Sequence, residues 1–458
     1  MQFETLFRAA REKPVTAALI GAGEFGLSLI AQSRRMQGLK ILAAADKDLA
    51  RVSAALKAMG VGTRRCDSAA AAKAAIAAGE IALCESVADL LSLPLDMVVE
   101  ATGDAEAGAR HATQAIEAGI GVTMVSKEAE CVVGPVLAQR ARKAGVGYTL
   151  VEGDQPALLI GLVSWARTLG LPIMAAGKSS EYDYVYDPAT HRVTWTDRSV
   201  TAPDIAKLWA LGKDAGATIA GRAAALAELP QRTVPDNCEM ALVANATGLM
   251  PDRPDFHAPM AHTPELPNIY RPRSEGGVLE KPGALDVFNC LRRPDEASFA
   301  GGVYVVVEWA DTKTGALFRG KGIPVCSNDR YGLVYNPSHL LGVEAPITIM
   351  AAARLNHSVV DERYRPVVDL TARAMRDLPA GHKLEIVGTR HAVPDLEPGL
   401  TPAMSVSAGN PLPYYMAVNR TLTRAVRKGD AITADCVGAP GSSVLWSLRA
   451  EQDRSFSG

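Results

Sequence analysis

The sequence VTAALIGAGEFG, from Val15 to Gly26, joins a short apolar run to three glycines in the spacing G-x-G-x-x-G. The apolar run predicts a buried strand, and the residues after Gly26 have the apolar spacing of a helix. In such a turn, the glycines allow a tight bend, close approach of a pyrophosphate and close packing of helix on strand, while the start of the helix offers free N–H groups. The segment therefore predicts dinucleotide binding by Gly21, Gly23, Glu24, Phe25 and Gly26.

An acidic residue follows at the distance expected for contact with the adenosine ribose. Asp46 ends the apolar run from Ile41 to Ala45, twenty residues after Gly26. A carboxylate there favours the free 2′-hydroxyl of NAD, whereas NADP usually requires a basic residue nearby. Because Lys47 and Arg51 follow closely, both NADP and NAD are compatible with these residues.

Length and composition favour a soluble enzyme with several domains. At 458 residues the chain is long enough for about three domains, and its formal charge of -2 gives no reason to expect nucleic acid or an anionic membrane as a partner. No apolar run approaches the roughly 18 residues that span a bilayer, and residues 1–14 lack the hydrophobic centre of a signal peptide. We therefore expect a cytoplasmic protein that acts on a small molecule. The seven cysteines form no C-x-x-C pair, so we expect reduced thiols.

The pattern along the chain predicts an α/β protein. Residues 1–155 alternate strand-like and helix-like segments, which is typical of a doubly wound parallel sheet of the Rossmann type. Residues 156–375 favour an α+β domain for substrate binding or dimerisation, and residues 376–458 favour a small β-rich domain. The strands expected in the first domain are Ala17–Ile20, Lys40–Ala45, Met97–Glu100, Val122–Ser126 and Gly147–Val151, and the alanine-rich tract Ser68–Ala78 is expected to be a helix.

Two strand ends of the first domain carry further candidates. The strand from Met97 ends in Ala101, Thr102 and Gly103, at the sheet edge where the nicotinamide half of the cofactor is expected. The next strand ends in Ser126 and Lys127. A lysine there either polarises a substrate oxygen during hydride transfer or pairs with a neighbouring glutamate on the surface.

The substrate half offers candidates that are less specific. Asp154 either binds a metal, moves a proton or caps the next helix, since Pro156 suits a first helical turn. Lys178, in a loop predicted from Gly177 to Glu181, is a candidate for contact with a phosphate or with the reacting hydroxyl, or is an ordinary solvated lysine. Glu181 in the same loop is a candidate for substrate binding, and its carboxylate, like that of Asp154, could hold a divalent cation.

A basic segment and a histidine complete the candidates. Arg319 and Lys321 lie among glycines in a stretch that suits an anion, or that forms a basic surface turn. His339 is a general acid, a substrate contact or a structural histidine, and His111 is expected to be structural. No spacing of residues identifies metal ligands.

These motifs resemble the cofactor domain of the homoserine dehydrogenase superfamily. The resemblance rests on the segments G-A-G-E-F-G, V-V-E-A-T-G and V-S-K, and it covers roughly residues 15–160. The substrate half departs from that family, because it lacks the D-x-x-G-x-D-x-x-R-K run of true homoserine dehydrogenases. The segments Leu378–Gly381 and Arg427–Val437 resemble a SAF domain.

A core of this kind followed by a SAF module is similar to the 1-deoxy-D-xylulose 5-phosphate reductoisomerase-like proteins. The resemblance implies NADPH, a divalent cation such as Mg²⁺ or Mn²⁺, and a homodimer. It also implies reduction of a small phosphorylated sugar-like carbonyl, with 1-deoxy-D-xylulose 5-phosphate converted to 2-C-methyl-D-erythritol 4-phosphate for isoprenoid synthesis as the first candidate. The alternatives are a dehydrogenase of an unphosphorylated polyol, hydroxy acid or amino acid, and a non-catalytic NAD(P)-binding regulator.

Overall fold

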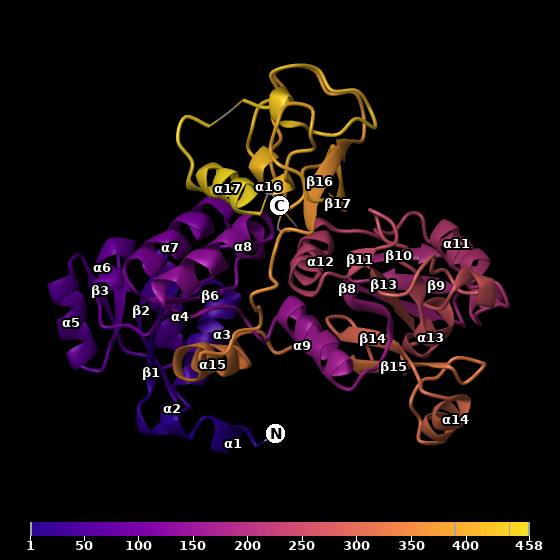
Figure 1. Ribbon diagram of the computed structural model, residues 1–458, viewed down its shortest axis with the longest axis horizontal. Coiled ribbons are helices and arrows are strands. Elements are labelled where there is room, and N and C mark those ends of the chain that lie inside the picture. Colours follow the sequence, from indigo (N-terminus) through magenta and orange to yellow (C-terminus); the bar gives the residue numbers. More distant parts are fainter. Residues whose placement is uncertain (1, 389–390, 439, 457–458) are drawn as a thin grey trace.

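The computed structural model describes residues 2–388, 391–438 and 440–456, which form three domains that meet near the centre of the molecule (Figure 1). The first domain is built on a parallel sheet, the second on a mixed sheet and the third on a small antiparallel pair of strands. This architecture confirms the predicted α/β fold class with a Rossmann-type sheet at its start. In the part of the chain that the structure describes, no helix is both long and apolar enough to cross a membrane.

The first sheet has seven parallel strands in the order β3-β4-β2-β1-β5-β6-β7. The first strand, β1, lies in the middle of the sheet. Strands β2, β3 and β4 lie on one side of it and β5, β6 and β7 on the other, so the direction of winding reverses between β1 and β5. In doubly wound sheets, ligands bind at the carboxyl ends of the strands beside this reversal. The strands are β1 (Val15–Ile20), β2 (Leu39–Ala45), β3 (Thr63–Cys66), β4 (Ile81–Cys84), β5 (Met97–Glu100), β6 (Gly121–Met124) and β7 (Tyr148–Leu150).

Helices cover both faces of this sheet. The alanine-rich tract forms α5, as predicted, and the hydroxyl of Ser68 caps it by accepting a hydrogen bond from the N–H of Ala71. Strands β3 and β4 were not predicted: β3 is a polar edge strand, and β4 is a short buried run that follows closely on the alanine-rich helix α5. The helices are α1 (Phe3–Leu6), α2 (Arg8–Glu12), α3 (Glu24–Ser33), α4 (Leu49–Ala58), α5 (Ala69–Ala77), α6 (Val87–Leu91), α7 (Ala105–Glu117) and α8 (Lys127–Ala144).

The second sheet is organised around the long strand β8 (Ile173–Asp187). This strand pairs with β13 (Ala284–Arg292) in parallel and with β14 (Val303–Glu308) in antiparallel, and its far end pairs with β9. The other strands are β9 (Arg192–Trp195), β10 (Arg198–Thr201), β11 (Met250–Pro251), β12 (Met260–Ala261) and β15 (Tyr331–Asn336). The helices are α9 (Gln155–Thr168), α10 (Ile205–Leu208), α11 (Ala215–Ala225), α12 (Val234–Thr247), α13 (Leu266–Ile269) and α14 (Thr312–Gly320), with the 3-10 turns η1 (Thr263–Glu265) and η2 (Arg273–Glu275).

Two local predictions for this domain are wrong. The stretch Gly177–Glu181 is not a loop but lies inside β8, because β13 and β14 pair with β8 on its two sides, and Lys178, Ser179 and Ser180 are buried there. A Cβ atom on Gly177 would collide with the carbonyl oxygen of Asp286, so only glycine fits there. Arg319 lies in the last turn of α14 rather than in a glycine loop, since Asp311 caps that helix.

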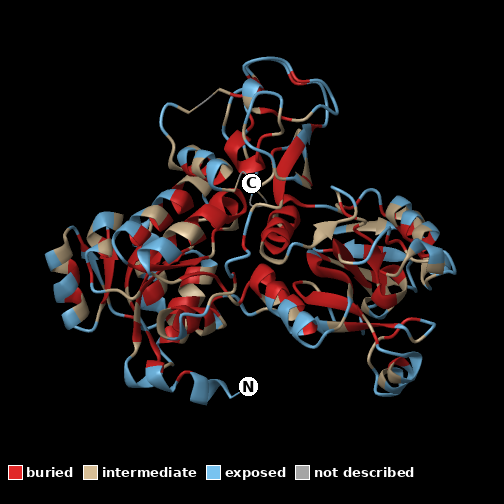
Figure 2. Cartoon of the chain, in the orientation of Figure 1, coloured by how far each residue is buried: buried red, intermediate tan, exposed pale blue. Residues whose placement is uncertain are grey.

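The chain returns to the first domain before it enters the third. After the 3-10 turn η3 (Leu341–Val343), α15 (Pro346–Leu355) packs beside β1 and β7. The third domain then contains β16 (Val368–Ala374), β17 (Leu396–Pro402), α16 (Tyr414–Ala417), η4 (Ala434–Cys436) and α17 (Val444–Ser455). Buried residues fill both large sheets and much of α8 and α12 (Figure 2). The seven cysteines are all buried free thiols.

Candidate active site

The glycine turn has the geometry that its sequence predicts. Gly21 has a φ of +91°, and a Cβ atom there would lie 2.5 Å from the carbonyl oxygen of Ala101, so the turn passes directly over the end of β5. A Cβ atom on Gly26 would lie 2.6 Å from the side chain of Leu19, which explains how closely α3 packs on β1. By contrast, nothing lies within 4 Å of a Cβ atom on Gly23, and no side chain caps α3. The start of α3 is therefore open to an anion.

A groove of about 510 Å³ runs from this turn across the carboxyl ends of β1, β2 and β5. Its size and its position at the reversal of the sheet fit a dinucleotide. Among the predicted cofactor residues, the groove is lined by Gly21, Gly23, Asp46, Lys47, Ala101 and Thr102, and Arg51, Arg110 and His111 also line it.

The carboxylate of Asp46 already accepts hydrogen bonds from backbone N–H groups near it. It accepts them from the N–H of Ala22 at 2.7 Å and from the N–H of Asp48 at 2.9 Å. The guanidinium of Arg51 lies 3.3 Å from the same carboxylate and donates to the carbonyl of Ala22 at 3.1 Å. One carboxylate oxygen of Asp46 therefore holds the glycine turn and the other holds the backbone before α4, while Arg51 and the exposed Lys47 bring positive charge to the groove.

The ends of β5 and β6 are tied together by buried polar side chains. Glu100, which is fully buried, accepts a hydrogen bond from the hydroxyl of Thr102 at 2.6 Å and lies 3.3 Å from Nδ1 of His111. The hydroxyl of Ser126 accepts from the N–H of Gly103 at 2.9 Å. These contacts fix the shape of the sheet edge where the nicotinamide half of a dinucleotide is expected.

Five charged side chains meet where the first and second domains face each other. Lys127 begins α8, and its Nζ lies 2.6 Å from Glu239 and 3.1 Å from Asp154. Lys178 projects from β8, and its Nζ pairs with the other oxygen of Glu239 and, at 2.8 Å, with Asp236. We call Lys127, Asp154, Lys178, Asp236 and Glu239 the lysine–carboxylate cluster. It joins the start of α8 to the second domain through the helix α12.

The two lysines of the cluster differ in exposure. About a quarter of the Lys127 side chain is accessible to solvent, whereas 2% of the Lys178 side chain is. Burial opposes the charge of both ammonium groups, but the neighbouring carboxylates outweigh it and hold the pKa of each lysine above its usual value. Lys127 is therefore a charged hydrogen-bond donor at the surface of the cluster, and Lys178 is its buried counterpart.

The carboxylates respond to these lysines in different ways. Burial acts to raise the pKa of Glu239, but the two ammonium groups outweigh it and lower that pKa to about 2. Burial raises the pKa of Asp236 to about 6, against the attraction of Lys178. Asp154 also accepts a hydrogen bond from the N–H of Gln155 and so caps α9, which means that it is both a helix cap and an ion-pair partner of Lys127.

The cluster does not fit a divalent cation. In residues 2–388, 391–438 and 440–456, no three His, Cys, Asp or Glu side chains are arranged as a metal site. Asp154, Asp236 and Glu239 each lie within ion-pair distance of an ammonium group, so the oxygens that would bind a cation already pair with lysine. The lysine ammonium groups are therefore the members of the cluster that can act on a substrate.

Arg319 and Lys321 lie apart from the cluster, whereas His339 and Glu181 lie near it. Figure 1 shows α14, which carries Arg319, at the outer end of the second domain, away from α8 and α12. Arg319 pairs with Asp329 at 2.6 Å, and Lys321 follows it on an exposed turn. Nδ1 of His339 lies 2.7 Å from the carbonyl oxygen of Gly301. The carbonyl of the next residue, Gly302, accepts hydrogen bonds from Nε2 of Gln155 and from the N–H of Ser179, so His339 lies close to the chain around Asp154 and Lys178. Glu181 is exposed but close enough to Asp236 to raise its pKa.

Two members of the cluster were missed by reasoning from sequence. Asp236 and Glu239 are three residues apart on α12 and therefore share one face of a helix that is otherwise rich in apolar residues. Acidic residues buried in such a helix need partners of opposite charge. The spacing was thus a signal, but the sequence does not show that β8 and α8 would supply both lysines.

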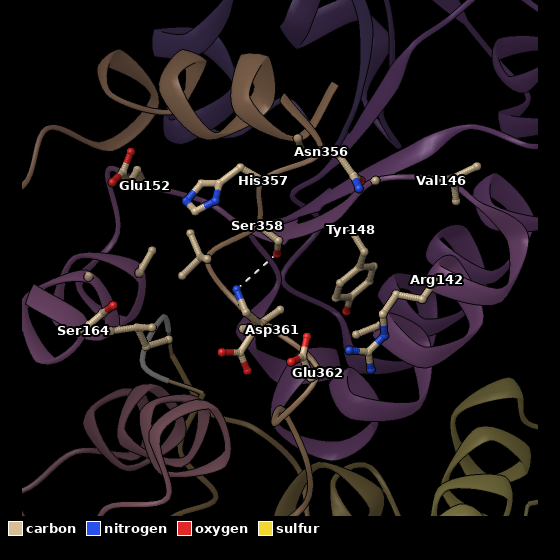
Figure 3. A pocket seen from close by; sticks show the side chains of 18 residues that line it. Arg142, Val146, Tyr148, Glu152, Ser164, Asn356, His357, Ser358, Asp361 and Glu362 are labelled. Atoms are coloured by element: carbon tan, nitrogen blue, oxygen red, sulfur yellow. Dashed lines mark hydrogen bonds between the residues drawn. The ribbon is translucent and has the colours of Figure 1, made fainter. Parts of the chain in front are cut away.

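A second pocket, of about 480 Å³, lies beside the edge strand β7 (Figure 3). Arg142, His357, Asp361 and Glu362 are among its lining residues, together with Tyr148, whose hydroxyl donates a hydrogen bond to the buried carboxylate of Glu130. Arg142 lies at the end of α8 and Tyr148 at the beginning of β7, while Glu152, two residues before Asp154, also lines the pocket. None of the five residues of the lysine–carboxylate cluster lines it.

Glu130 is expected to make the stability of the protein depend on pH. It also accepts a hydrogen bond from Tyr364 at 2.8 Å, yet burial outweighs both hydrogen bonds and raises its pKa to about 7. Since the pKa in the unfolded chain is about 4.3, this group favours folding at low pH, and that contribution is lost as the pH rises through 7. The variant Glu130→Gln, which stays neutral, is expected to lose about 2–3 kcal/mol less stability than the parent between pH 5 and pH 8.

Urea unfolding at both pH values measures this difference. The exposed residue Glu117, at the end of α7, supplies the control variant Glu117→Gln, which is expected to follow the parent at each pH. An equal loss of stability in Glu130→Gln and in the parent would show that Glu130 is already ionised in the folded protein at pH 5.

Two family models match the chain, and together they define its class. Residues 21–150 match the model described as "Homoserine dehydrogenase, NAD binding domain". Residues 153–345 match the model described as "Oxidoreductase DRL, catalytic domain". The order of these domains, with the glycine turn in the first and most of the lysine–carboxylate cluster in the second, is that of a nicotinamide-dependent oxidoreductase.

Several solved structures are similar to part of the chain at low identity. One is an oxidoreductase from Agrobacterium radiobacter in complex with NAD+, L-tartaric acid and magnesium, at 16% identity over 37% of this chain and 46% of that chain, with a TM-score of 0.27. Another is a DOX-P reductoisomerase in complex with NADPH, fosmidomycin and magnesium, at 18% identity over 36% and 45%, with a TM-score of 0.27. A third is the WlbA dehydrogenase from Bordetella pertussis in complex with NADH and UDP-GlcNAcA, at 18% identity over 39% and 49%, with a TM-score of 0.27.

These similarities are limited in extent. The chain spans less than half the length of each of the three solved structures. No curated protein matches it. The substrate must therefore be inferred from the residues of the site.

Proposed function

We propose that this chain reduces the carbonyl group of a small, hydroxyl-rich substrate with NAD(P)H. The proposal rests on one observation above all. Lys127 is a charged and partly exposed donor at the carboxyl end of β6, one strand away from the end of β5 that passes under the glycine turn. A donor at that edge lies where a carbonyl oxygen would gain negative charge as it is reduced.

Each member of the cluster has a role in this proposal. A nicotinamide dinucleotide bound in the groove would supply the hydride. Lys127 would donate a hydrogen bond to the substrate oxygen, and Glu239 and Asp154 hold the ammonium group of Lys127 in place. Lys178, which is enclosed, balances Glu239 and Asp236 so that Glu239 stays ionised. In this proposal Lys127, Lys178 and Asp154 act together as parts of one network of ion pairs, and Lys127 is the member that donates to the substrate.

Two classes of substrate are distinguished by different observations. A phosphorylated ketose such as 1-deoxy-D-xylulose 5-phosphate is supported by the resemblance of the domain order and by the match of residues 153–345 to the catalytic domain of an oxidoreductase. An unphosphorylated polyol, hydroxy acid or amino acid is supported by the position of Arg319, which pairs with Asp329 at a distance from the cluster. We take the phosphorylated ketose as the first substrate to test.

The test is consumption of NADPH and NADH by the purified chain. The substrates are 1-deoxy-D-xylulose 5-phosphate and a panel of unphosphorylated carbonyls, each with and without added Mg²⁺. Turnover of the phosphorylated ketose supports the first class, and turnover confined to the panel supports the second. If every substrate leaves both cofactors unoxidised although both bind, the chain is a non-catalytic NAD(P)-binding protein and the proposal is wrong.

NADPH is proposed as the preferred cofactor for two reasons. The Asp46 carboxylate already binds the N–H of Ala22 in the glycine turn, and Arg51 adds positive charge to the groove, which favours the 2′-phosphate. In Arg51→Gln, the Kd for NADPH is expected to rise about 10-fold, as for loss of one hydrogen bond between charged groups, and the Kd for NADH to change less than about twofold. Fluorescence titration measures both constants. Lys57→Gln, at the other end of α4, is the control. An equal loss for both cofactors would mean that Arg51 only supports the turn.

Two further proposals concern the third domain and the oligomeric state of the chain. We propose that the third domain is a SAF module, because Leu378 bridges to Val426 and Val437 bridges to Leu422, so that both segments that carry that resemblance pair with the stretch from Leu422 to Val426. We also propose that the chain forms a homodimer in the cytoplasm. Gel filtration with light scattering measures the oligomeric state.

A further inference from the structure

The third domain is attached to the first domain by buried polar contacts. Pro135 lies inside α8, and the side chain of Gln452 of α17 binds the backbone of α8 beside it. That side chain accepts from the N–H of Val136 at 3.2 Å and donates to the carbonyl of Val132 at 2.9 Å. In addition, the Glu106 carboxylate of α7 accepts from the first N–H groups of α17. The domain is therefore held on α7 and α8.

The third domain is attached to the second domain as well. Asn245, which is buried near the end of α12, accepts hydrogen bonds from the N–H groups of Val367 and Val368 at 2.7 and 2.9 Å. Because α8 and α12 both contribute to the lysine–carboxylate cluster, a domain fixed to both helices lies over the junction where the cluster is found. Figure 1 shows this position, with the third domain above α8 and α12.

From this position the third domain places His391 at the edge of the site. Nδ1 of His391 lies 3.6 Å from Glu128, the residue that follows Lys127. A Cβ atom on Gly103 would lie 3.8 Å from Cε1 of the same ring, so His391 also faces the end of β5. Tyr415 of α16 meets the ring edge-on, and about a third of the His391 side chain is accessible.

We infer that the third domain completes the active site by contributing His391 as a residue that contacts the substrate, with Glu128 as its positioning residue. The inference rests on the proposed function. An imidazole between the end of β5 and the start of α8 lies beside the donor Lys127, at the edge where the reacting carbonyl would bind. It would form a hydrogen bond with the hydroxyl next to that carbonyl, which favours a 2-hydroxy ketone or aldehyde over a simple carbonyl compound.

The charges around the ring agree with this role. Burial lowers the pKa of His391 and the Lys127 ammonium lowers it further, so the ring is neutral at pH 7 and able to accept a hydrogen bond. Burial also raises the pKa of Glu128 to about 7, against the effect of Lys127. A neutral ring beside a partly protonated carboxyl group suits recognition of a hydroxyl rather than of a phosphate.

The test compares His391→Gln with the parent on two substrates: the 2-hydroxy carbonyl compound, phosphorylated or not, that the parent reduces fastest, and its analogue without the adjacent hydroxyl. We expect kcat/KM to fall about 10- to 100-fold for the hydroxylated substrate and less than about threefold for the analogue, with the Kd for NADPH unchanged. Glu128→Gln is expected to show a smaller loss with the same selectivity, and the double variant to be no worse than His391→Gln. His382→Gln is the matched control, since His382 lies in the same domain but pairs with Asp395.

The outcomes separate this inference from the proposed function. If the parent oxidises no cofactor with any carbonyl, the proposed function fails and the inference fails with it. If the parent is active and His391→Gln has the same kcat/KM, only the inference is overturned. An equal loss for both substrates, or a loss of NADPH binding, would mean that His391 merely supports the fold, which also overturns it.

Discussion

Replacement of Lys127 by methionine is expected to lower kcat about 100- to 1,000-fold, while the Kd for NADPH changes little. The magnitude is that found when a single donor to a developing oxyanion is removed from an active site. Lys127 is the only lysine of the lysine–carboxylate cluster with substantial exposure, so no other ammonium group of the cluster can reach the same oxygen. Methionine is one atom shorter than lysine, so it keeps most of the apolar chain and removes the ammonium group with its charge and its hydrogen bonds.

The position of Lys127 makes a matched control available on the same helix. Lys143 lies in the last turn of α8 and is exposed, so Lys143→Met is expected to retain the kcat and the cofactor affinity of the parent. Stopped-flow or steady-state oxidation of NADPH gives kcat, and fluorescence titration gives the Kd. If Lys127→Met keeps a kcat within about threefold of the parent, Lys127 is a structural ion-pair partner and the proposed chemistry is wrong.

The first domain was predictable from sequence because its signals are local. The glycine turn, the apolar strand from Met97 and the alanine-rich helix each follow from a few neighbouring residues, and the structure confirms them. The second domain carries weaker local signals. Lys178 and its polar neighbours look like a loop in the sequence, and only the pairing of β8 with β13 and β14 makes them the middle of a sheet.

The site was only partly predictable for the same reason. Lys127, Asp154 and Lys178 were selected separately, each from its place after a strand or in a polar stretch, and the structure brings the three together. What joins them is Glu239, a residue with no distinguishing motif whose partners lie 112 and 61 positions away in the chain. His391 comes from a third domain, and sequence alone gives no reason to place it beside Glu128.

The second large effect is expected on stability, from Lys178→Met. Lys178 is almost fully buried, and its ammonium group neutralises Asp236 and one oxygen of Glu239. Removing one partner of a buried ion pair leaves uncompensated charge in a medium of low polarity, which costs about 3–5 kcal/mol. The free energy of unfolding in urea at pH 7.5 should fall by that amount, whereas Lys207→Met, at an exposed position in the same domain, should change it by less than about 0.5 kcal/mol.

The loss in Lys178→Met should depend on pH, with a sign that identifies its cause. Without the ammonium group, burial raises the pKa of Asp236 still further above its value in the unfolded chain, so the folded variant takes up a proton as the pH falls and the destabilisation becomes smaller toward pH 5. Adding Asp236→Asn should recover part of the lost stability at pH 7.5, because the amide carries no charge to be neutralised. A loss that is equal at both pH values and unaffected by Asp236→Asn would show that Lys178 stabilises the fold through packing of its alkyl chain rather than through its charge.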